Sequence, residues 1–302
     1  MLRLPILRHG RPYHSLDRRA LRDPITGDLL AEVGLANPGL IRRDLLSASS
    51  AAAVLRSVPI ADLLAMATEA AQRFLEDTLE IPGTGARMAF DEHLQHLSAT
   101  TGLPLALCDF HSRRLAKAFG EVPETVRGLT RGLDLRILEA GYGEQNGIRL
   151  GYFPLTDVLG AVLPNNSPGV NSLWLPAIAL RTPVALKPGA SDPWTPLRVV
   201  AAWLAAGCPP EAFSVYPADH AGADALAETA GRVLLFGGAA TVERYAGDPR
   251  VEVHGPGYSK ILLGPDAIDD WEAYLDVLVT SVAAGGGRSC VNASTIVVPR
   301  HA

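Results

Sequence analysis

Short apolar runs alternate with helix-length segments between residues 157 and 246, and this alternation restricts the fold more than any other feature. The runs read "DVLGAVLP", "PVALKP", "FSVYPA" and "RVLLFGG", and a segment of helical composition follows each of them. Short apolar runs predict buried strands, and strands that alternate with helices predict a parallel sheet covered on both faces. We therefore expect an α/β fold with a doubly wound, Rossmann-like parallel sheet.

Three loops directly follow predicted strands and are the first place to look for a ligand. They read "PNNSPG", "KPGASD" and "FGGAA". In parallel α/β sheets, ligands bind in the crevice beyond the carboxyl ends of the strands. We therefore expect these three loops to belong to one binding region.

The remaining segments carry weaker patterns. The first 30 residues predict strands and turns, and residues 60–75 predict an amphipathic helix because apolar side chains recur at steps of three and four. Residues 85–150 show no clear pattern. After residue 250 we expect a strand pair, a helix and a glycine–cysteine turn, so a domain boundary is predicted near residue 253, between a domain of residues 1–252 and one that begins at 253–302.

Composition excludes several classes of protein. A formal charge of −5 argues against nucleic acid as the main partner, because binding phosphates needs a basic face. No stretch approaches the roughly 20 apolar residues of a membrane helix, and the N-terminus lacks the apolar core of a signal peptide. With only three cysteines, a disulfide framework is not expected. We predict a soluble, cytoplasmic protein without a metal site.

One cysteine stands apart from the other two. Cys290 lies in "GGGRSCVNASTIVV", after three glycines that would let a substrate approach the backbone. A cysteine attacks as its thiolate and therefore needs partial exposure, and its own amide could donate to an oxyanion. The alternative is a small buried hydrophobic side chain, which is what most free cysteines are. That alternative is preferred for Cys108 and Cys208, which have apolar or capping contexts.

Five stretches, in order along the chain, resemble the aldehyde dehydrogenase superfamily. They are "DPITGDLLAEV", "VLGAVLPNNSPGVNSLWLPAIALRTPVALKPG", "CPPEAFSVYP", "LLFGG" and "GGGRSCVNASTIVV". The third stretch, "CPPEAFSVYP", resembles the family's proline-rich segment before a strand. The last resembles the segment that carries the family's nucleophilic cysteine. The segment "VEVHGPGYSKILL" looks most like the glycine–proline–glycine turn of the CoA-acylating branch, although Tyr258 replaces that branch's usual asparagine.

The resemblance implies specific roles for residues in this sequence. Cys290 would attack an aldehyde carbonyl, and Asn166 would donate its amide to the developing oxyanion. The cofactor, NAD or NADP, would be bound by residues in the three strand-end loops: Leu163, Pro164, Lys187, Gly237 and Gly238. From the residues alone, Asn166 as a turn former and Lys187 as a solvated surface lysine stay open. Gly237 and Gly238 precede a predicted helix, whose first backbone N–H groups suit a pyrophosphate.

Two departures from the family pattern bear on the reaction. Ala190 stands where the family commonly has a glutamate that holds the ribose hydroxyls, so NADP is as plausible as NAD. The glutamate that activates water in hydrolytic members falls on Val253, and one inserted residue would bring Glu252 into line. His254 is a conceivable base, but a structural or exposed histidine is the preferred reading.

These departures favour a thiol over water as the acyl acceptor. The resemblance therefore implies an NAD(P)-dependent aldehyde oxidoreductase that is CoA-acylating, with a small aldehyde or an acyl-CoA as substrate. The alternatives are a hydrolytic aldehyde dehydrogenase and a truncated, non-catalytic nucleotide-binding subunit. The chain stops a dozen residues past Cys290, where relatives continue. We expect it to hold only the start of the catalytic domain, and the full-length protein to be a homo-oligomer.

Overall fold

The computed structural model describes residues 1–300, which divide into two compact units. The first unit comprises residues 1–235 and 248–252, and the second comprises residues 236–247 and the chain from residue 253 onward. The segment after residue 253 therefore lies in the second unit, together with a short insertion from the end of the predicted parallel sheet. The function of each unit as a domain stays a prediction.

A seven-stranded sheet carries the four runs that the sequence predicts as strands. These are β10 (Leu159–Val162), β11 (Val184–Lys187), β12 (Phe213–Val215) and β13 (Arg232–Phe236). Together with β14 (Val251–His254), β2 (Ile6–Arg8) and β3 (Arg11–Tyr13), they follow the order β14-β13-β10-β11-β12-β2-β3. The pairs β10–β11, β10–β13 and β11–β12 are parallel, whereas β2 adds to β12 antiparallel.

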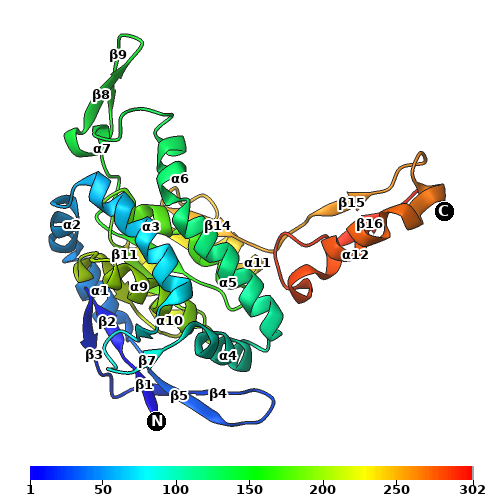
Figure 1. Cartoon of the computed structure of the whole chain (residues 1–302), viewed down its shortest axis with the longest axis horizontal. Helices are drawn as coiled ribbons and strands as arrows, with labels where there is room; N and C mark the ends of the chain where they lie inside the picture. Colours follow the sequence, from blue (N-terminus) through cyan, green and yellow to red (C-terminus); the bar gives the residue numbers. More distant parts are fainter. Residues whose placement is uncertain (301–302) are drawn as a thin grey trace. The chain divides into compact units, whose positions relative to one another are not determined.

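The strand order identifies the type of sheet. If β10 to β14 are numbered from one to five, their spatial order is 3-2-1-4-5, which matches the first five strands of the Rossmann order 3-2-1-4-5-6. The predicted doubly wound α/β fold is therefore confirmed (Figure 1).

Helices follow the strands as predicted, with one difference. After β11 comes α9 (Trp194–Ala205), after β12 comes α10 (His220–Thr229), and after β13 comes α11 (Ala239–Tyr245). The segment after β10 does not form one helix as expected. It forms a 3₁₀ helix, η1 (Pro168–Leu173), and a short α-helix, α8 (Leu175–Ala179). Pro176 explains the break, because its ring cannot fit the interior of a continuous helix and is tolerated only in a first turn.

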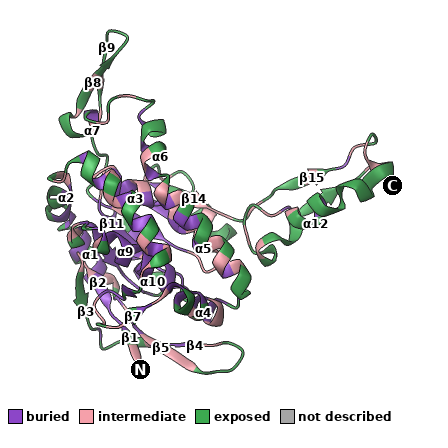
Figure 2. Ribbon diagram, in the orientation of Figure 1, coloured by how far each residue is buried: buried purple, intermediate pink, exposed green. Residues whose placement is uncertain are grey.

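The core of the first unit lies between the sheet and its helices. Trp174, Trp203, Phe213 and Tyr216 are fully buried there. Helix α9 is buried along nearly its whole length, as Figure 2 shows. It packs on α3 (Ile60–Glu76), the amphipathic helix that the sequence predicts, and α3 also lies beside α5 (Leu105–Gly120; Figure 1).

The N-terminal strands and the unpatterned region complete the first unit. As expected, the first residues form strands: β1 (Leu2–Leu4) and β4 (Arg18–Arg22) flank β5 (Leu29–Gly34) in a separate sheet. Between residues 36 and 151 lie, besides α3 and α5, the elements α1 (Pro38–Leu45), α2 (Ala48–Arg56), β6 (Leu79–Glu80), β7 (Arg87–Met88), α4 (Phe90–Thr101), α6 (Val122–Leu129), α7 (Ile137–Ala140) and the hairpin of β8 (Tyr142–Gln145) and β9 (Ile148–Gly151).

Within residues 1–300, no single helix has the length and apolar character needed to cross a membrane. Helices α2 and α3 reach that length and composition only as a pair, and the pair bends by 96° at the break between them.

The second unit has little interior. The parallel pair β15 (Lys260–Leu262) and β16 (Thr295–Val297) lies with the helices η3 (Ile268–Tyr274), α12 (Leu275–Ala283) and η4 (Ala284–Gly287). Among its described residues, only Leu263, Leu278 and Ala293 are buried. Most of α12 and β15 is exposed, as Figure 2 shows.

Candidate functional site

The carboxyl ends of β10 and its two neighbours define where a ligand would bind in the first unit. Val162, the last residue of β10, pairs with Lys187 on one side and with Leu235 on the other. The strand order reverses between β10 and β13, and such a reversal opens a crevice at the carboxyl ends of the strands. Leu163 and Pro164 follow β10 at this edge, and the Leu163 N–H donates to the carbonyl of Lys187 at 2.9 Å.

The structure brings the loops after β10 and β11 into contact, as the sequence predicts. The backbone N–H of Ser191 donates to Oδ1 of Asn165 at 2.7 Å. A Cβ on Gly189 would lie 2.4 Å from that oxygen and 2.5 Å from the carbonyl oxygen of Pro164. Only glycine therefore fits at this position. Sequence analysis did not single out Asn165 or Gly189, although both lie in the loops that it selected.

Asn166 is half-buried in the loop after β10. The next residue, Ser167, accepts the N–H of Gly169 on its Oγ at 3.2 Å and so begins η1. Asn166 thus lies between a strand end and a capped helix start, which restricts its backbone. It belongs to the first unit and Cys290 to the second, so its role as an oxyanion donor stays a prediction.

Lys187 ends β11 with its side chain half-buried. Burial lowers its pKa below the ordinary value, the positive charge of Arg19 lowers it further, and Asp219 opposes both effects. Arg19 comes from β4, where its Nη2 donates to the carbonyl oxygen of Ala190 at 3.0 Å. Arg19 is not among the predicted site residues, because nothing in its local pattern indicates a contact with a loop so distant in the chain.

Gly237 and Gly238 join β13 to α11 in the second unit. The Gly237 N–H donates to the carbonyl of His254 at 3.1 Å, and a Cβ at this position would lie 2.5 Å from the side chain of Thr241. Gly238 is the N-cap residue of α11, and a Cβ there would meet open space. The helix start that the sequence predicts after these glycines is confirmed, whereas their contact with a cofactor stays a prediction.

Cys290 is exposed, so its interpretation as a small buried side chain is wrong. It follows η4, in which Gly285, Gly286 and Gly287 all have φ between 64° and 69°. This left-handed conformation is available to glycine without a steric penalty. Cys108 and Cys208 are buried, as expected, and burial raises their pKa values to about 11 and about 12. Thiols with such pKa values are almost entirely protonated at neutral pH and are inert.

Asn292 holds the cysteine loop by its side chain. Its Nδ2 donates to the carbonyls of Ala284, Ser281 and Val282 at 2.9 to 3.1 Å, and its Oδ1 accepts the N–H of Ser289 at 3.0 Å. One amide thus ties the end of α12 to the residue before Cys290. Asn292 is not among the site residues predicted from the sequence.

The glycine–proline–glycine turn contacts the cysteine loop directly. A Cβ on Gly257 would lie 1.5 Å from the carbonyl oxygen of Cys290, a distance that no pair of atoms without a bond can reach. The two backbones are therefore in contact, and any side chain at this position would displace the peptide group of Cys290. This gives a physical reason for the glycine that ends the "GPG" turn.

The two bases considered from the sequence have different surroundings. The His254 ring stacks on Phe236, with 4.5 Å between ring centroids and 13° between ring planes. This packing supports the structural reading of His254. Glu252 is exposed, and the following residue, Val253, is half-buried on the same strand. Because successive side chains of a strand point to opposite faces, the side chains of Glu252 and Val253 cannot both point to the face where a catalytic base would lie.

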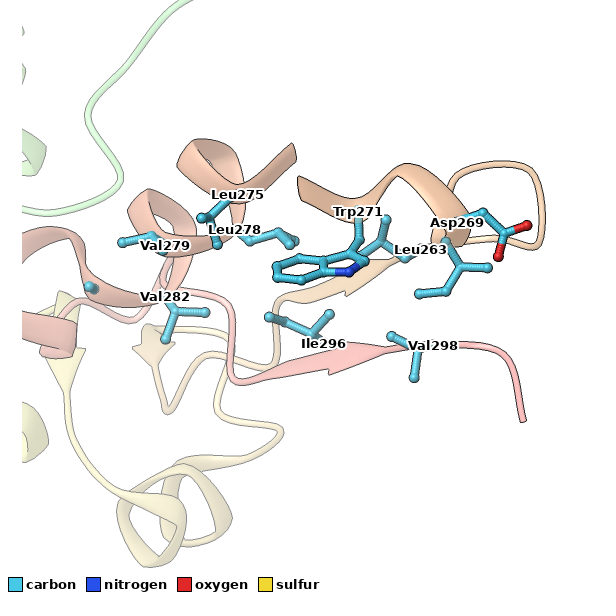
Figure 3. A pocket seen from close by; sticks show the side chains of 11 residues that line it. Leu263, Asp269, Trp271, Leu275, Leu278, Val279, Val282, Ile296 and Val298 are labelled. Carbon is cyan, nitrogen blue, oxygen red and sulfur yellow. The ribbon is translucent and has the colours of Figure 1, made fainter. Parts of the chain in front are cut away.

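The second unit contains a large apolar groove between α12 and β16. It has a volume of about 850 Å³ (Figure 3). Its lining includes Leu275, Leu278, Val279 and Val282, which follow one another at helical spacing along α12. Trp271 and Ile296 face each other across the groove in Figure 3. The groove lies next to the glycine turn that leads to Cys290, because Val282 is followed closely by η4.

Each unit, taken by itself, offers a group that suits part of a nicotinamide dinucleotide. In the first unit, Lys187 offers an ammonium group that has no hydrogen bond or ion pair within residues 1–300. In the second unit, Gly238 leaves open space at the start of α11. A cation and backbone N–H groups are the donors that ribose and phosphate oxygens require. Over the same described residues, no group of three or more His, Cys, Asp and Glu side chains is placed to hold a metal ion.

Comparison with a protein-family model gives one match that covers nearly the whole chain. Residues 13–302 match the model described as "Aldehyde dehydrogenase family".

Several solved structures of similar fold are described as aldehyde dehydrogenases. An indole-3-acetaldehyde dehydrogenase from P. syringae, in complex with NAD+ and IAA, has a TM-score of 0.81 at 21% identity. A gamma-glutamyl-gamma-aminobutyraldehyde dehydrogenase from Burkholderia cenocepacia has a TM-score of 0.80 at 19% identity, and a succinate-semialdehyde dehydrogenase from Burkholderia pseudomallei one of 0.78 at 19%. The matches cover 98 to 99% of this chain but 59 to 60% of the other chains, so it spans about three fifths of their length.

Proposed function

The chain belongs to the aldehyde dehydrogenase family, and we propose that it is an NAD(P)-dependent aldehyde oxidoreductase that forms a thioester on Cys290. The observation that carries the proposal is the setting of this cysteine. Its side chain is exposed, while its backbone is held by Gly257 and its loop by Asn292. A fixed backbone with an accessible thiol is what a nucleophilic cysteine requires.

The reaction follows from the chemistry of a thiol. Cys290 loses its proton to solvent, and its sulfur forms a bond to the aldehyde carbon, so that the carbonyl oxygen takes the negative charge. Asn166 and the Cys290 N–H would donate hydrogen bonds to that oxygen. A nicotinamide dinucleotide, when bound, supplies the hydride acceptor. Loss of hydride from the aldehyde carbon restores the C=O bond, leaves a thioester on Cys290 and completes a two-electron oxidation.

We propose that coenzyme A, rather than water, releases the acyl group. The CoA thiol attacks the thioester carbon, the bond to Cys290 breaks, and the cysteine thiol is restored. Two features support this choice. In a gap-free alignment with the family pattern, Val253 falls where the water-activating glutamate is expected, and the "GPG" turn that resembles the acylating branch contacts Cys290 through Gly257. In the opposite direction the same steps reduce an acyl-CoA to an aldehyde.

The setting of the protein is also a proposal. Three free cysteines support a reducing compartment such as the cytoplasm. A homo-oligomer stays a prediction, as does the identity of the small aldehyde.

Product analysis of the 302-residue chain tests the reaction. We expect the reduced cofactor to form from an aldehyde only when CoA is present, with acyl-CoA as the product. Carboxylate formation that is independent of CoA would instead indicate the hydrolytic reaction through Glu252. Binding of NAD or NADP without turnover of any aldehyde or acyl-CoA would indicate a nucleotide-binding subunit without catalysis.

Substitution of the cysteine separates chemistry from folding. Cys290→Ala should abolish turnover, by a factor of about 10³ or more, while the affinity for the cofactor changes little. Cys208→Ala is the matched control, because this thiol is buried and should not react. Iodoacetamide should label Cys290 and leave Cys208 unmodified. A chain that loses both cofactor binding and turnover on Cys290→Ala would show that the cysteine is structural.

A further inference from the structure

The carboxyl end of β11 is the part of the site that distinguishes two forms of the cofactor. In dinucleotide-binding sheets with this strand order, the end of the second strand lies near the adenosine ribose. Enzymes that use NAD place a carboxylate there to bind the ribose 2′-hydroxyl, whereas a cationic side chain accommodates the 2′-phosphate of NADP. In this chain that end carries Lys187. The inference rests on the proposed dinucleotide function.

A second cation reaches the same loop from another sheet. Arg19 lies on β4 and is fixed by the hydrogen bond from its Nη2 to the carbonyl oxygen of Ala190, three residues after Lys187. Like Lys187, Arg19 is half-buried, and within residues 1–300 its side chain donates only to a neutral carbonyl. Neither side chain forms an ion pair within residues 1–300.

Arg19 and Lys187 are both half-buried and neither is paired with a carboxylate, so the two positive charges repel each other. Binding of an anion between them would lower their electrostatic free energy. Burial lowers the pKa of both groups, and the charge of Arg19 further lowers that of Lys187. The opposing charge that acts on Lys187 is the single carboxylate of Asp219, whose Oδ1 accepts the Gly222 N–H at the start of α10, so two cations face one anion. The loop therefore retains an excess of positive charge.

Ala190 leaves room for the negative charge of a ligand. Its side chain is an exposed methyl group at the position where a carboxylate would repel a phosphate. A phosphate monoester carries between one and two negative charges at neutral pH, which two cations can balance.

We propose that Arg19 and Lys187 together bind the 2′-phosphate of an adenosine ribose, so that the chain selects NADP over NAD. Arg19 is the specificity-determining residue, because it comes from outside the parallel sheet and presents several donors in one plane. Lys187 contributes to both cofactors, since it lies on the strand itself.

Calorimetric titration with two cofactor fragments tests the proposal without turnover. The fragments are adenosine 2′,5′-bisphosphate and adenosine 5′-monophosphate, which differ only in the 2′-phosphate. We expect the 302-residue chain to bind the bisphosphate about tenfold or more tightly, and Arg19→Gln to remove most of that difference while leaving affinity for the monophosphate unchanged. Ala190→Glu should likewise weaken the bisphosphate selectively, and Arg19→Lys should retain part of the preference.

Arg18→Gln is the matched control. Arg18 precedes Arg19 on β4, so its side chain points to the opposite face, where its Nη1 lies 3.6 Å from Glu32. The Arg18→Gln variant should bind the bisphosphate and the monophosphate with unchanged affinity. Equal binding of the two fragments, or an Arg19→Gln variant that loses both equally, would overturn the proposal but not the dinucleotide function. Failure of the parent chain to bind either fragment, NAD or NADP would overturn both.

Discussion

Asp192 is a buried carboxyl group at the end of the loop that carries Lys187. Only 4% of its surface is exposed, and its Oδ1 accepts the backbone N–H of Thr195 in the first turn of α9 at 2.9 Å. Burial raises its pKa from 3.8 to about 6, and the hydrogen bonds from α9 oppose that rise. The folded chain therefore holds this proton more tightly than the unfolded chain does.

The sign of the pH effect follows from that difference. Between pH 4 and pH 6 the unfolded chain loses the proton first, so the free energy of unfolding falls as the pH rises through this window. The contribution is at most about 3 kcal/mol. Asp192→Asn keeps an acceptor for Thr195 and removes the charge. We expect this variant to match the parent at pH 4 and to be about 1–3 kcal/mol more stable at pH 7.

Urea unfolding at the two pH values measures this prediction. Asp62→Asn on the exposed face of α3 serves as the control and should change neither value by more than about 0.5 kcal/mol. An Asp192→Asn variant that is less stable than the parent at pH 7 would show that the carboxylate form is favoured in the folded chain.

At the scale of elements, one arginine joins α9 to α3 and β7. Arg198 is 5% exposed, and its guanidinium donates to the carbonyls of Phe74, Asp77 and Met88 at 2.8 to 2.9 Å. Phe74 and Asp77 lie at the carboxyl end of α3, whose last carbonyl groups have no partner inside the helix. Arg198 therefore serves as a cap supplied by another helix.

Removal of this cap should be costly. Arg198→Met preserves apolar volume but leaves three carbonyl groups without their donor, so we expect a loss of about 2 kcal/mol or more in the free energy of unfolding. Arg127→Met is the control, since Arg127 pairs with Glu124 on the surface of α6 and should contribute less than about 1 kcal/mol. Urea unfolding of both variants provides the comparison. An equal loss in the free energy of unfolding in the two variants would contradict the role of Arg198 as a cap of α3.

The elements also show what could be predicted from sequence. The strands β10 to β13 follow from short apolar runs, and the helix α3 follows from apolar periodicity. Both patterns reflect burial and are local. The elements between residues 79 and 151 include two-residue strands and a hairpin with exposed side chains, which produce no such period. Pro176 lies within an apolar run that predicts one helix, and its ring divides that run into η1 and α8.

The candidate site likewise contains residues with a local sequence pattern and residues without one. Cys290, Lys187 and the glycine pair lie in recognisable local patterns, and the loops after β10 and β11 do come together. Arg19 and Asn292 have no local signature, because their roles depend on carbonyl groups elsewhere in the fold. Hydrogen bonds from one side chain to a distant backbone cannot be read from spacing along the chain.

At the scale of the molecule, the two units differ in how much apolar surface they bury. The first contains a seven-stranded sheet with Ala161 and Leu186 fully buried, and the second has only Leu263, Leu278 and Ala293 buried among its described residues. Since burial of apolar surface is the main stabilising contribution, local opening should cost far less in the second unit.

Hydrogen exchange followed by mass spectrometry tests this difference. We expect amides of α12 and β16 to exchange at least about a hundredfold faster than those of β10 and β11 under native conditions. Urea too dilute to affect the sheet should abolish the remaining protection of α12. Equal protection of both units would contradict the prediction. It would mean that the apolar groove of Figure 3 is covered in solution.

The contact of Gly257 with Cys290 has a consequence for reading genetic variation in this chain. A single added methyl group at residue 257 would collide with the carbonyl oxygen of Cys290, the proposed nucleophile. A glycine-to-alanine change adds only one methyl group, yet at this position we expect it to impair activity as loss of the thiol would. A variant that alters this turn should therefore be grouped with variants of the proposed nucleophile, although the two positions are 33 residues apart in the chain.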